Sequence, residues 1–307
     1  MDHILVVAMP RGCAAFSSTY VHTIEYGSEN QAGSPAISSL LIMVLAEREK
    51  RRENDRELLM SGEGCNMVGR PLSTFERDRR KVRRNMKSYS GWNATIYNRL
   101  WRTFTQRTLT ETTQQIDIAN LRGIQLRQGR APRLLDIACG TGILLLWLIE
   151  NIPDAEAYGV DASSDMLAQA QTLLHTYPHV RLEQATLGTG ETAHLPFAPE
   201  TFDLITCTNA FHELANPVRS LQGIAHLLAP EGQLVLEDYA QRPSFLLWPV
   251  VEWISRRVEE GHVRAHTVAE AEAMCTQAGL SVVRKSTFVV NWLWHGWTLC
   301  LQKDEST

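Results

Sequence analysis

The stretch Leu-Leu-Asp-Ile-Ala-Cys-Gly-Thr-Gly at residues 134–142 decides the fold of this protein. Its first half is an apolar run typical of a buried β-strand, its second half is a glycine-rich turn, and the apolar residues that follow have helical spacing. Glycines at such a turn let the backbone approach a ligand closely, and the N–H groups that open the helix point toward a carboxylate or a phosphate. The stretch therefore predicts a strand–turn–helix unit that binds a ligand at its turn.

The spacing of the glycines separates this turn from a dinucleotide-binding fingerprint. The pattern is A-x-G-x-G over residues 138–142, and the residue three positions after Gly142 is Leu145, so G-x-G-x-x-G is not completed. This counts against NAD or FAD as the ligand. A nicotinamide-dependent oxidoreductase is accordingly the third-ranked interpretation, and tight binding of NADH is what it requires.

Short apolar strands alternate with helices after Pro132. Strands are expected at residues 133–138, 155–161, 180–184, 202–208 and 232–239, and helices at residues 142–151, 164–176 and 217–228. Such alternation implies right-handed crossovers, and it predicts an α/β fold with a doubly wound, mostly parallel sheet that carries helices on both faces. Ligands bind such a sheet at the carboxyl ends of its strands.

The second expected strand ends at Asp161. A carboxylate in that place can accept hydrogen bonds from both hydroxyl groups of a ribose. The structural alternatives are that Asp136 only caps the turn and that Asp161 caps the following helix together with Ser163 or Ser164. The glycine turn and the acid on the second strand together favour a cofactor that contains a nucleoside.

In these and further motifs the chain resembles the class I S-adenosylmethionine-dependent methyltransferases. The resemblance is greatest to the small-molecule branch typified by the methyltransferases of ubiquinone and menaquinone biosynthesis, and it covers about residues 133–301. The motifs that carry it, in the order of the family, are LLDIACGTG (134–142), GVDASSDML (159–167), LPF (195–197), FDLI (202–205), FHEL (211–214) and LAPEG (228–232). The resemblance implies S-adenosylmethionine as the cofactor and a seven-stranded Rossmann-like sheet. The last elements fit the C-terminal hairpin of that sheet and place Trp292, Trp294 and His295 in its turn region.

The resemblance implies that the methionine part of the cofactor lies along the backbone of the glycine turn. It further implies that Asp136 orients the ammonium group directly or through water, and that Asn209 lies near the methionine carboxylate or the methyl group. The turn residues concerned are Ala138, Cys139, Gly140 and Gly142.

For the adenosine part, the resemblance implies that Asp161 holds the ribose and that Ala162 or Met166 packs against adenine. Family members have an acid four residues before the leucine of LPF, which bonds the adenine amino group. Glu191, followed by Thr192, occupies that place. The segment before it is about five residues longer than the family pattern, which makes this assignment weaker than the others.

The catalytic group is less well specified. Methyl transfer from a sulfonium is an in-line displacement in which the protein positions the acceptor, excludes water and, for an oxygen or nitrogen acceptor, removes a proton. His212 follows the fourth strand and is the leading general-base candidate, because histidine as a residue type titrates near neutrality; the alternative is that it is structural. Weaker candidates are Glu213, Asp238, Tyr239 and His262. No metal is expected.

Three regions are expected along the chain. Residues 1–87 read poorly as a domain, because polar, charged and glycine-rich stretches follow one another without hydrophobic periodicity, and we expect a dispensable extension. Residues 88–130 form N-terminal helices, of which the one at 92–104 is packed on the main domain or is a lid that brings Tyr97 to the substrate. A second helix is expected at residues 106–128, and residues 129–132 break it. Residues 131–307 form the cofactor-binding domain.

Tryptophan is concentrated near the C-terminus, at positions 248, 253, 292, 294 and 297. The apolar segment 245–251 predicts a helical insert after the fifth strand, at about residues 240–265, placed over the active site as a lid. Either the tryptophans belong to the core or to a homo-oligomer interface, or they form an aromatic wall for a hydrophobic acceptor. Isoprenoid, quinone, polyketide and lipid-like compounds fit that wall.

Composition excludes several other functions. With 30 basic and 34 acidic residues the net charge is −4, which disfavours nucleic acid as the main partner, and the D/N-P-P-Y motif of amino-group methyltransferases is absent. The six cysteines are scattered without a C-x-x-C pair, which suggests a cytoplasmic protein without disulfides. No apolar run reaches the length of about 20 residues that a membrane-spanning helix needs.

We therefore expect an S-adenosylmethionine-dependent methyltransferase that methylates carbon or oxygen of a hydrophobic small molecule, as in secondary metabolism. The alternative is a non-catalytic protein that binds the same cofactor as a regulatory or scaffold subunit.

Overall fold

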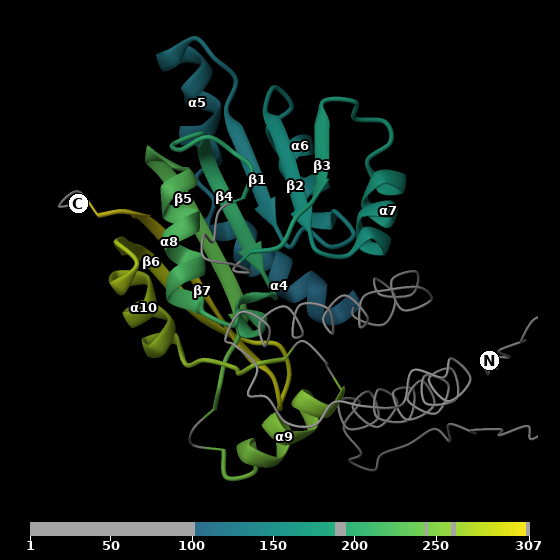
Figure 1. The fold of residues 1–307 in the computed structure, drawn as a ribbon, viewed down its shortest axis with the longest axis vertical. Coiled ribbons are helices and arrows are strands. Elements are labelled where there is room, and N and C mark those ends of the chain that lie inside the picture. Colours follow the sequence, from purple (N-terminus) through teal and green to yellow (C-terminus); the bar gives the residue numbers. More distant parts are fainter. Residues whose placement is uncertain (1–101, 188–194, 243–244, 259–261, 305–307) are drawn as a thin grey trace, which may run out of the picture.

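The computed structural model describes residues 102–187, 195–242, 245–258 and 262–304. Its centre is a seven-stranded sheet in the order β3-β2-β1-β4-β5-β7-β6 (Figure 1). The strands are β1 (Arg133–Ile137), β2 (Glu156–Asp161), β3 (Val180–Gln184), β4 (Phe202–Thr208), β5 (Leu228–Tyr239), β6 (Leu280–Val289) and β7 (His295–Lys303). The expected doubly wound sheet is confirmed, including its terminal hairpin.

Strands β1 to β5 are parallel to one another, and β7 runs antiparallel to both β5 and β6. The strand order reverses between β1 and β4, because β2 and β3 lie on one side of β1 and the later strands lie on the other. Loops that leave β1 and β4 therefore diverge at their carboxyl ends, where this class of sheet forms its ligand crevice.

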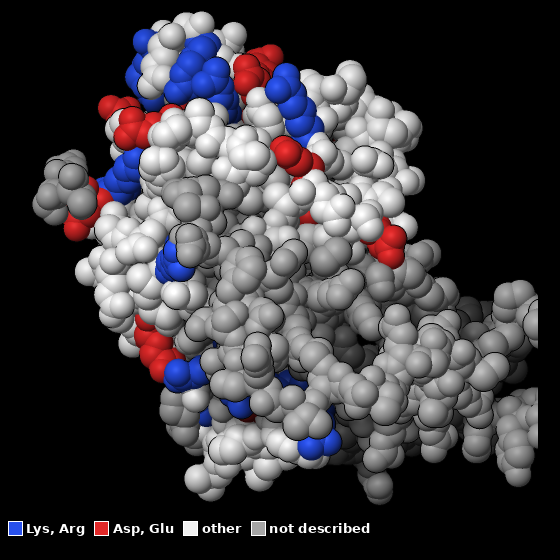
Figure 2. Space-filling model, in the orientation of Figure 1, with Lys and Arg blue, Asp and Glu red and all other residues white. Residues whose placement is uncertain are grey.

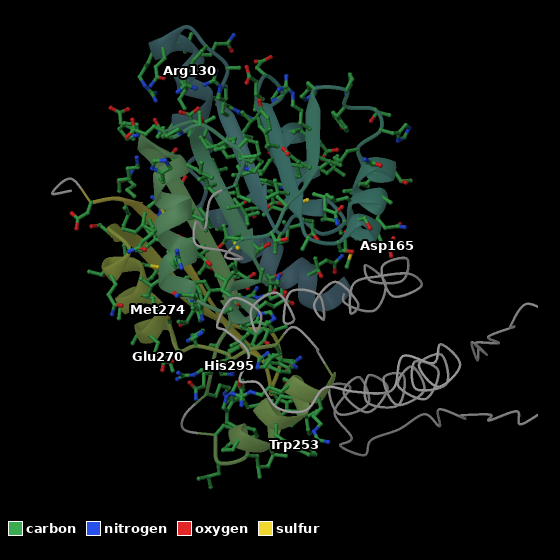
Figure 3. The ribbon with its side chains drawn as sticks, in the orientation of Figure 1. Arg130, Asp165, Trp253, Glu270, Met274 and His295 are labelled. Carbon is green, nitrogen blue, oxygen red and sulfur yellow. The ribbon has the colours of Figure 1, made fainter. Side chains whose placement is uncertain are left out.

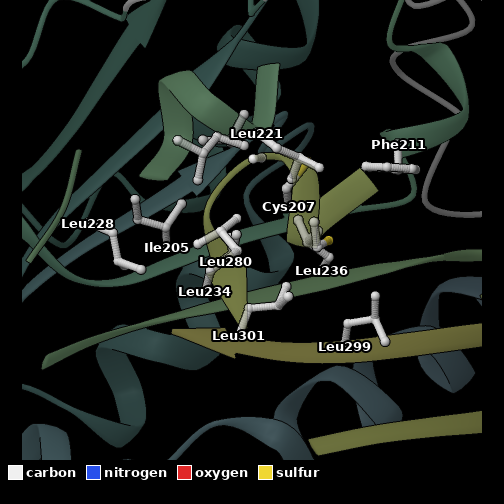
Figure 4. Packing of buried hydrophobic residues seen from close by; sticks show 14 of the residues in the cluster. Ile205, Cys207, Phe211, Leu221, Leu228, Leu234, Leu236, Leu280, Leu299 and Leu301 are labelled. Atoms are coloured by element: carbon white, nitrogen blue, oxygen red, sulfur yellow. The ribbon is translucent and has the colours of Figure 1, made fainter. Parts of the chain in front are cut away.

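Helices cover both faces of the sheet. They are α4 (Arg102–Gln115), α5 (Ile118–Gln128), α6 (Ile143–Asn151), α7 (Ser164–Leu173), the 3₁₀ turn η1 (Phe211–Glu213), α8 (Pro217–Leu227), α9 (Trp248–Val258) and α10 (Val268–Gln277). One core cluster joins α8 and α10 to the sheet (Figure 4), and a second joins α5, α6 and α7 to the opposite face. Alternation along the strands explains this division: Leu234 and Leu236 belong to the first cluster, whereas Val235 belongs to the second.

The single helix expected at residues 106–128 is wrong, because the structure has two helices there. Helix α4 ends at Gln115, and Asp117 caps α5 by accepting a hydrogen bond from the backbone N–H of Asn120. The break is bridged by one side chain of β5: the Gln233 amide donates to the Gln115 carbonyl and accepts from the Asp117 backbone N–H. The stop that was expected after this helix is confirmed at Gly129, which has a φ of 65°.

Smaller corrections concern the ends of elements. The helix expected to reach residue 176 ends at Leu173, and the fifth strand begins at Leu228 rather than at residue 232. His295, which was expected in a turn, is the first residue of β7 and pairs with Val289. Ala138 lies outside β1, since its φ of 56° already belongs to the glycine turn.

Helix α9 is located where the insert was expected, beyond the carboxyl ends of the parallel strands (Figure 1). The proposed extension at residues 1–87 and the side chain of Tyr97 lie outside the described residues. Among the residues that are described, no helix is both long and apolar enough to cross a bilayer.

Candidate active site

The glycine turn after β1 has a left-handed backbone conformation at three of its residues. Ala138, Gly140 and Gly142 have φ angles of 56°, 53° and 81°. A Cβ atom added at Gly140 would meet no atom within 4 Å, so the space above this residue is open, whereas one at Gly142 would lie 3.1 Å from both Ala170 and Leu174 of the α7 region. Gly142 therefore lets α6 pack closely on α7, and Gly140 leaves room for a ligand against the backbone.

Asp161 connects the end of β2 to this turn. Its Oδ2 accepts a hydrogen bond of 2.9 Å from the Gly140 backbone N–H, and its Oδ1 accepts one of 2.8 Å from Ser163. Burial raises the pKa of this carboxyl, and the backbone hydrogen bonds lower it, with a net direction upward. Ser163 is the N-cap of α7, because its hydroxyl accepts a hydrogen bond from the Met166 backbone N–H. Asp161 is not the cap itself, but it binds the backbone N–H of the cap residue. A carboxylate can accept about four hydrogen bonds, so Asp161 can still accept one from a ligand hydroxyl.

Asp136 is buried on β1, next to β4. Its Oδ1 accepts a hydrogen bond of 2.7 Å from the Thr206 hydroxyl. Burial raises the pKa of this carboxyl to about 7, against a smaller lowering by Thr206. A cation placed beside it would return the carboxyl to its ionised form, which suits a partner such as an ammonium group.

Asn209 follows β4 with a φ of 51°. Its side-chain Nδ2 donates to the Thr108 hydroxyl over 3.2 Å, and its backbone N–H donates to the carbonyl of Glu237. Its Oδ1 is buried, and so are both carboxyl oxygens of Glu237, and no described residue hydrogen-bonds any of the three. Burial raises the pKa of Glu237 well above its usual range. Unpaired buried oxygens are costly, and they fit a site that a ligand completes.

Of the remaining candidate cofactor residues, the structure describes Met166, Ala162 and Cys139. Met166 is buried in the first turn of α7, and Ala162 is partly exposed beside Asp161. Cys139 is buried, and burial raises the pKa of its thiol, which makes it a packing residue rather than a nucleophile. Glu191 and Thr192 lie outside the described residues.

His212 is buried and attached to β5 through Asp238. Its backbone N–H donates to Asp238 Oδ2 over 2.6 Å, and its Nδ1 lies 2.9 Å from both oxygens of that carboxylate. Its carbonyl accepts from the N–H groups of Val263 and Arg264. Glu213 Oε1 lies 3.8 Å from the remaining ring nitrogen, Nε2. The contacts with Asp238 hold the ring in a fixed orientation, as either the structural role or the general-base role requires.

A second histidine–carboxylate pair lies beside the first. Tyr239 and His262 are joined by a short hydrogen bond between the phenol oxygen and Nδ1, and His262 Nε2 lies 2.8 Å from Glu252 Oε1 of helix α9. The Tyr239 ring lies 4.4 Å from the His212 ring, measured between centroids. Burial raises the pKa of Glu252, but the hydrogen bonds from His262 and Ala265 and the charges of His262 and Arg256 together lower it further, so the net direction is downward. The insert helix is thus tied to the end of β5 through polar groups.

Comparisons with known proteins agree with this geometry. Residues 135–234 match the model of a family described as a methyltransferase domain. The chain is 31% identical over 144 residues to the uncharacterized methyltransferase YcgJ of Bacillus subtilis and 35% identical over 125 residues to the demethylmenaquinone methyltransferase of Thermus thermophilus. These matches cover 46% and 40% of this chain and 54% of each relative, so the chain spans about half the length of these relatives.

The chain contains a methyltransferase domain. Its fold agrees with a crystal structure from Galdieria sulphuraria of a protein proposed to be a sarcosine dimethylglycine methyltransferase, with a TM-score of 0.54, 11% identity and coverage of 65% of this chain and 86% of that one. Within the methyltransferase domain, the expected turn, strand-two acid and strand-four asparagine all lie at the same edge of the sheet. The roles assigned to these residues remain predictions.

Four residues near this edge of the methyltransferase domain were not expected from the sequence: Thr206, Glu237, Glu252 and Thr108. Thr206 and Glu237 follow the inward alternation of their strands, so a polar residue at an inward position was the available signal. Glu252 and Thr108 lie on helices and reach the site only through tertiary contacts. In the part of the chain that the structure describes, no group of three or more metal-ligating side chains is placed to hold a metal.

Proposed function

We propose that this protein is an S-adenosylmethionine-dependent methyltransferase that acts on carbon or oxygen of a hydrophobic small molecule. The observation that carries the proposal is the open space over Gly140, next to a carboxylate, Asp161, that is hydrogen-bonded to the same backbone N–H. A nucleoside cofactor needs this combination of close backbone approach and ribose-binding acid.

The residues present fit the cofactor at both of its ends. Asp161 would hold a ribose hydroxyl with its remaining lone pair, and Asp136 would face the ammonium group of the methionine part. Asn209 Oδ1, buried without a partner among the described residues, offers one more acceptor for that group. When bound, S-adenosylmethionine supplies an electrophilic methyl group on sulfonium. The protein then has to bring the acceptor in line with that methyl group and keep water out.

Aromatic residues between α9 and the sheet support a hydrophobic acceptor. Trp248, Tyr239 and Leu293 form a small buried cluster, which Trp294 joins from its edge, and the Trp248 indole N–H is buried with no partner among the described residues. An apolar ring system with one polar substituent would suit a place beside this cluster. Trp297, by contrast, belongs to the main core. The demethylmenaquinone methyltransferase among the relatives favours an acceptor of the same hydrophobic class.

Two groups can accept the proton that an oxygen acceptor loses. His212, held by Asp238, is the first, and Tyr239, connected to His262 and Glu252, is the second. In the second case the acceptor proton passes to the Tyr239 oxygen while the phenol proton passes to His262 Nδ1, and Glu252 stabilises the resulting imidazolium. His212 is the simpler choice because it needs one transfer only.

Calorimetric titration with S-adenosylhomocysteine tests the cofactor site directly. We expect the wild-type protein to bind, and Asp161→Ala to weaken binding by roughly 100-fold, since a ribose hydrogen bond to a charged group is lost. Asp154→Ala is the matched control, because this exposed aspartate lies before β2, at the opposite edge of the sheet. NADH serves as the competing ligand. Preference for NADH, or equal loss of binding in both variants, contradicts the proposal.

Transfer is then tested with methyl-labelled cofactor and a panel of quinols, phenols and polyketide-like compounds. We expect label in the organic extract, and expect His212→Gln to lower kcat by roughly 10²-fold or more with little change in cofactor affinity. Cofactor that binds normally but is never consumed with any acceptor class indicates the non-catalytic alternative instead.

A further inference from the structure

Helix α9 has one buried face and one apolar face that is exposed. Trp248, Val251 and Ser255 are directed inward, and Trp248 is only 4% exposed. The opposite face, including the residue pair that precedes the helix, is apolar: its members are Leu246, Leu247, Val250 and Trp253. Their exposed fractions are 94%, 60%, 52% and 56%. Four large exposed apolar side chains, two on this short helix and two directly before it, exceed the scattered exposure that is usual on a protein surface.

Two arginines lie at the C-terminal end of this apolar face. Arg256 and Arg257 form the last turn of α9, and the Arg257 guanidinium lies 4.5 Å from the centroid of the Trp253 ring. The single acid of the helix, Glu252, is on the inner side, where it is bound to His262 and lies 3.5 Å from the guanidinium of Arg256, whose side chain is still 54% exposed. Figure 2 shows blue atoms of Lys and Arg beside the white surface at this end of the molecule, and Figure 3 places Trp253 there, far from Arg130 at the other end.

A second group of aromatic side chains, with an arginine beside it, lies next to α9. Trp292, in the turn between β6 and β7, is 46% exposed, and its ring packs against that of Phe245 at 6.5 Å between centroids. Arg242 donates a hydrogen bond of 2.7 Å to the carbonyl of Trp292 and lies over the Phe245 ring. Apolar and aromatic side chains with arginines among them thus extend from α9 onto the neighbouring turn.

We propose that this surface docks the protein onto a membrane that contains anionic lipid. Leucine, valine and tryptophan side chains would enter the boundary between headgroups and acyl chains, and Arg256 and Arg257 would bind lipid phosphates. The helix is too short to span a bilayer and would lie in its plane. A second copy of the chain is a poorer occupant, because among the described residues of this helix it offers the same arginines, and the one acid, Glu252, is held on the inner side by His262 and Arg256.

Docking through this surface would bring the candidate site close to the membrane. Helix α9 lies beyond the carboxyl ends of the parallel strands, at the same end of the molecule as the candidate site (Figure 1). A hydrophobic acceptor dissolved in the bilayer could then reach the site without crossing water. This consequence rests on the proposed function, whereas the docking itself does not.

Flotation of the full chain with vesicles tests the proposal. We expect binding to vesicles of phosphatidylcholine mixed with phosphatidylglycerol, weaker binding to phosphatidylcholine alone, and a decrease with added salt. The double variant Leu247→Glu/Val250→Glu should bind the mixed vesicles roughly tenfold more weakly or worse, because two apolar contacts are replaced by anions. Leu126→Glu is the matched control, since Leu126 is 90% exposed on α5, and it should bind as the wild type does.

Titration with S-adenosylhomocysteine accompanies each variant. An unchanged affinity in the double variant shows that its domain is folded, and it keeps failure of docking distinct from failure of the proposed function. Three outcomes overturn the proposal: no binding of the wild type to either vesicle, equal binding by the double variant, or a dimer in sedimentation that the double variant dissociates while vesicle binding is absent.

Discussion

Asp136 is expected to destabilise the ligand-free protein, and it is proposed to bind the ammonium group of the cofactor. Its carboxyl is buried, and burial raises its pKa to about 7. In the free protein this group is therefore largely protonated below neutrality. A bound ammonium group would favour the ionised form, so ligand binding should release a proton whenever the pH is below that pKa.

The first expectation concerns the pH dependence of binding. As the pH falls from about 8 to about 6, affinity for S-adenosylhomocysteine should decrease, approaching tenfold per pH unit below the pKa of about 7, since the proton must leave before the ammonium is held. Asp136→Asn should bind more weakly at pH 8 and show a much flatter profile. Calorimetry in two buffers of different ionisation heat counts the released proton directly. A wild-type affinity that is constant over this range would contradict the assignment.

The same substitution should stabilise the ligand-free protein at alkaline pH. The folded-state pKa of Asp136 is raised from 3.8 to about 7, so the unfolded chain ionises first as the pH rises. Stability is therefore lost between about pH 4 and about pH 7, by about 1.4 kcal/mol for each pH unit in that interval, and stays reduced above it. Asn has no ionisable group and still accepts the Thr206 hydrogen bond. Urea unfolding at pH 8 should show Asp136→Asn more stable by a few kcal/mol, with the difference almost absent near pH 4.

At the scale of elements, the packing of α6 on α7 depends on one glycine. Ala at Gly142 has to adopt a φ of 81° and to place its Cβ 3.1 Å from Ala170 and Leu174. Ala at Gly129, the cap of α5, faces a similar φ of 65° but meets no atom within 4 Å. We expect Gly129→Ala to cost about 1 kcal/mol and Gly142→Ala about 2–3 kcal/mol.

Urea unfolding of the two glycine variants separates backbone strain from crowding, because only the crowding differs between them. Equal losses of stability would mean that α6 and α7 shift apart without cost. The cofactor affinity of Gly142→Ala should fall as well, since Gly142 opens α6 and closes the turn that begins at Ala138.

The elements of the sheet could be predicted from the sequence because their signals are local. An apolar run such as that of β4 and the glycine turn after β1 each carry their own pattern, and β3 and β4 have the bounds expected for them. The break at residues 116–117 could not be predicted, because it depends on the Gln233 side chain, more than a hundred residues away in the sequence. The hydrogen bonds of His262 and Glu252 are unpredictable for the same reason: they exist only once α9 has packed against β5.

The candidate site residues differ in the same way: some belong to local sequence motifs, and others depend on contacts that form only in the folded protein. Asp161 and Gly140 belong to motifs, and their contact follows from adjacent parallel strands, so pattern alone placed them together. Glu237 was missed although it lies in a strand, because two successive acids, Glu237 and Asp238, at the end of an apolar run suggest exposed positions until the structure shows that both are buried.

At the scale of the whole molecule, four cysteines report on global unfolding. Cys139, Cys207, Cys275 and Cys300 are buried free thiols, spread from the glycine turn to the last strand. Burial raises the pKa of each thiol, so neither access nor ionisation favours reaction in the folded state. If the sheet opens as one unit, all four should react with a thiol reagent at one common rate.

S-adenosylhomocysteine should slow the labelling of the four thiols by the same factor. A ligand that binds only the folded state lowers the unfolded population by 1 + [L]/Kd, which is about 100-fold at a concentration of 100 Kd. Mass spectrometry of labelled peptides measures each cysteine separately. If Cys275 and Cys300 react faster than Cys139 and are not slowed by the ligand, then the β6–β7 hairpin with α10 opens independently of the cofactor edge. A common factor instead means that ligand binding at one edge stabilises all seven strands, because the sheet unfolds as a single cooperative unit.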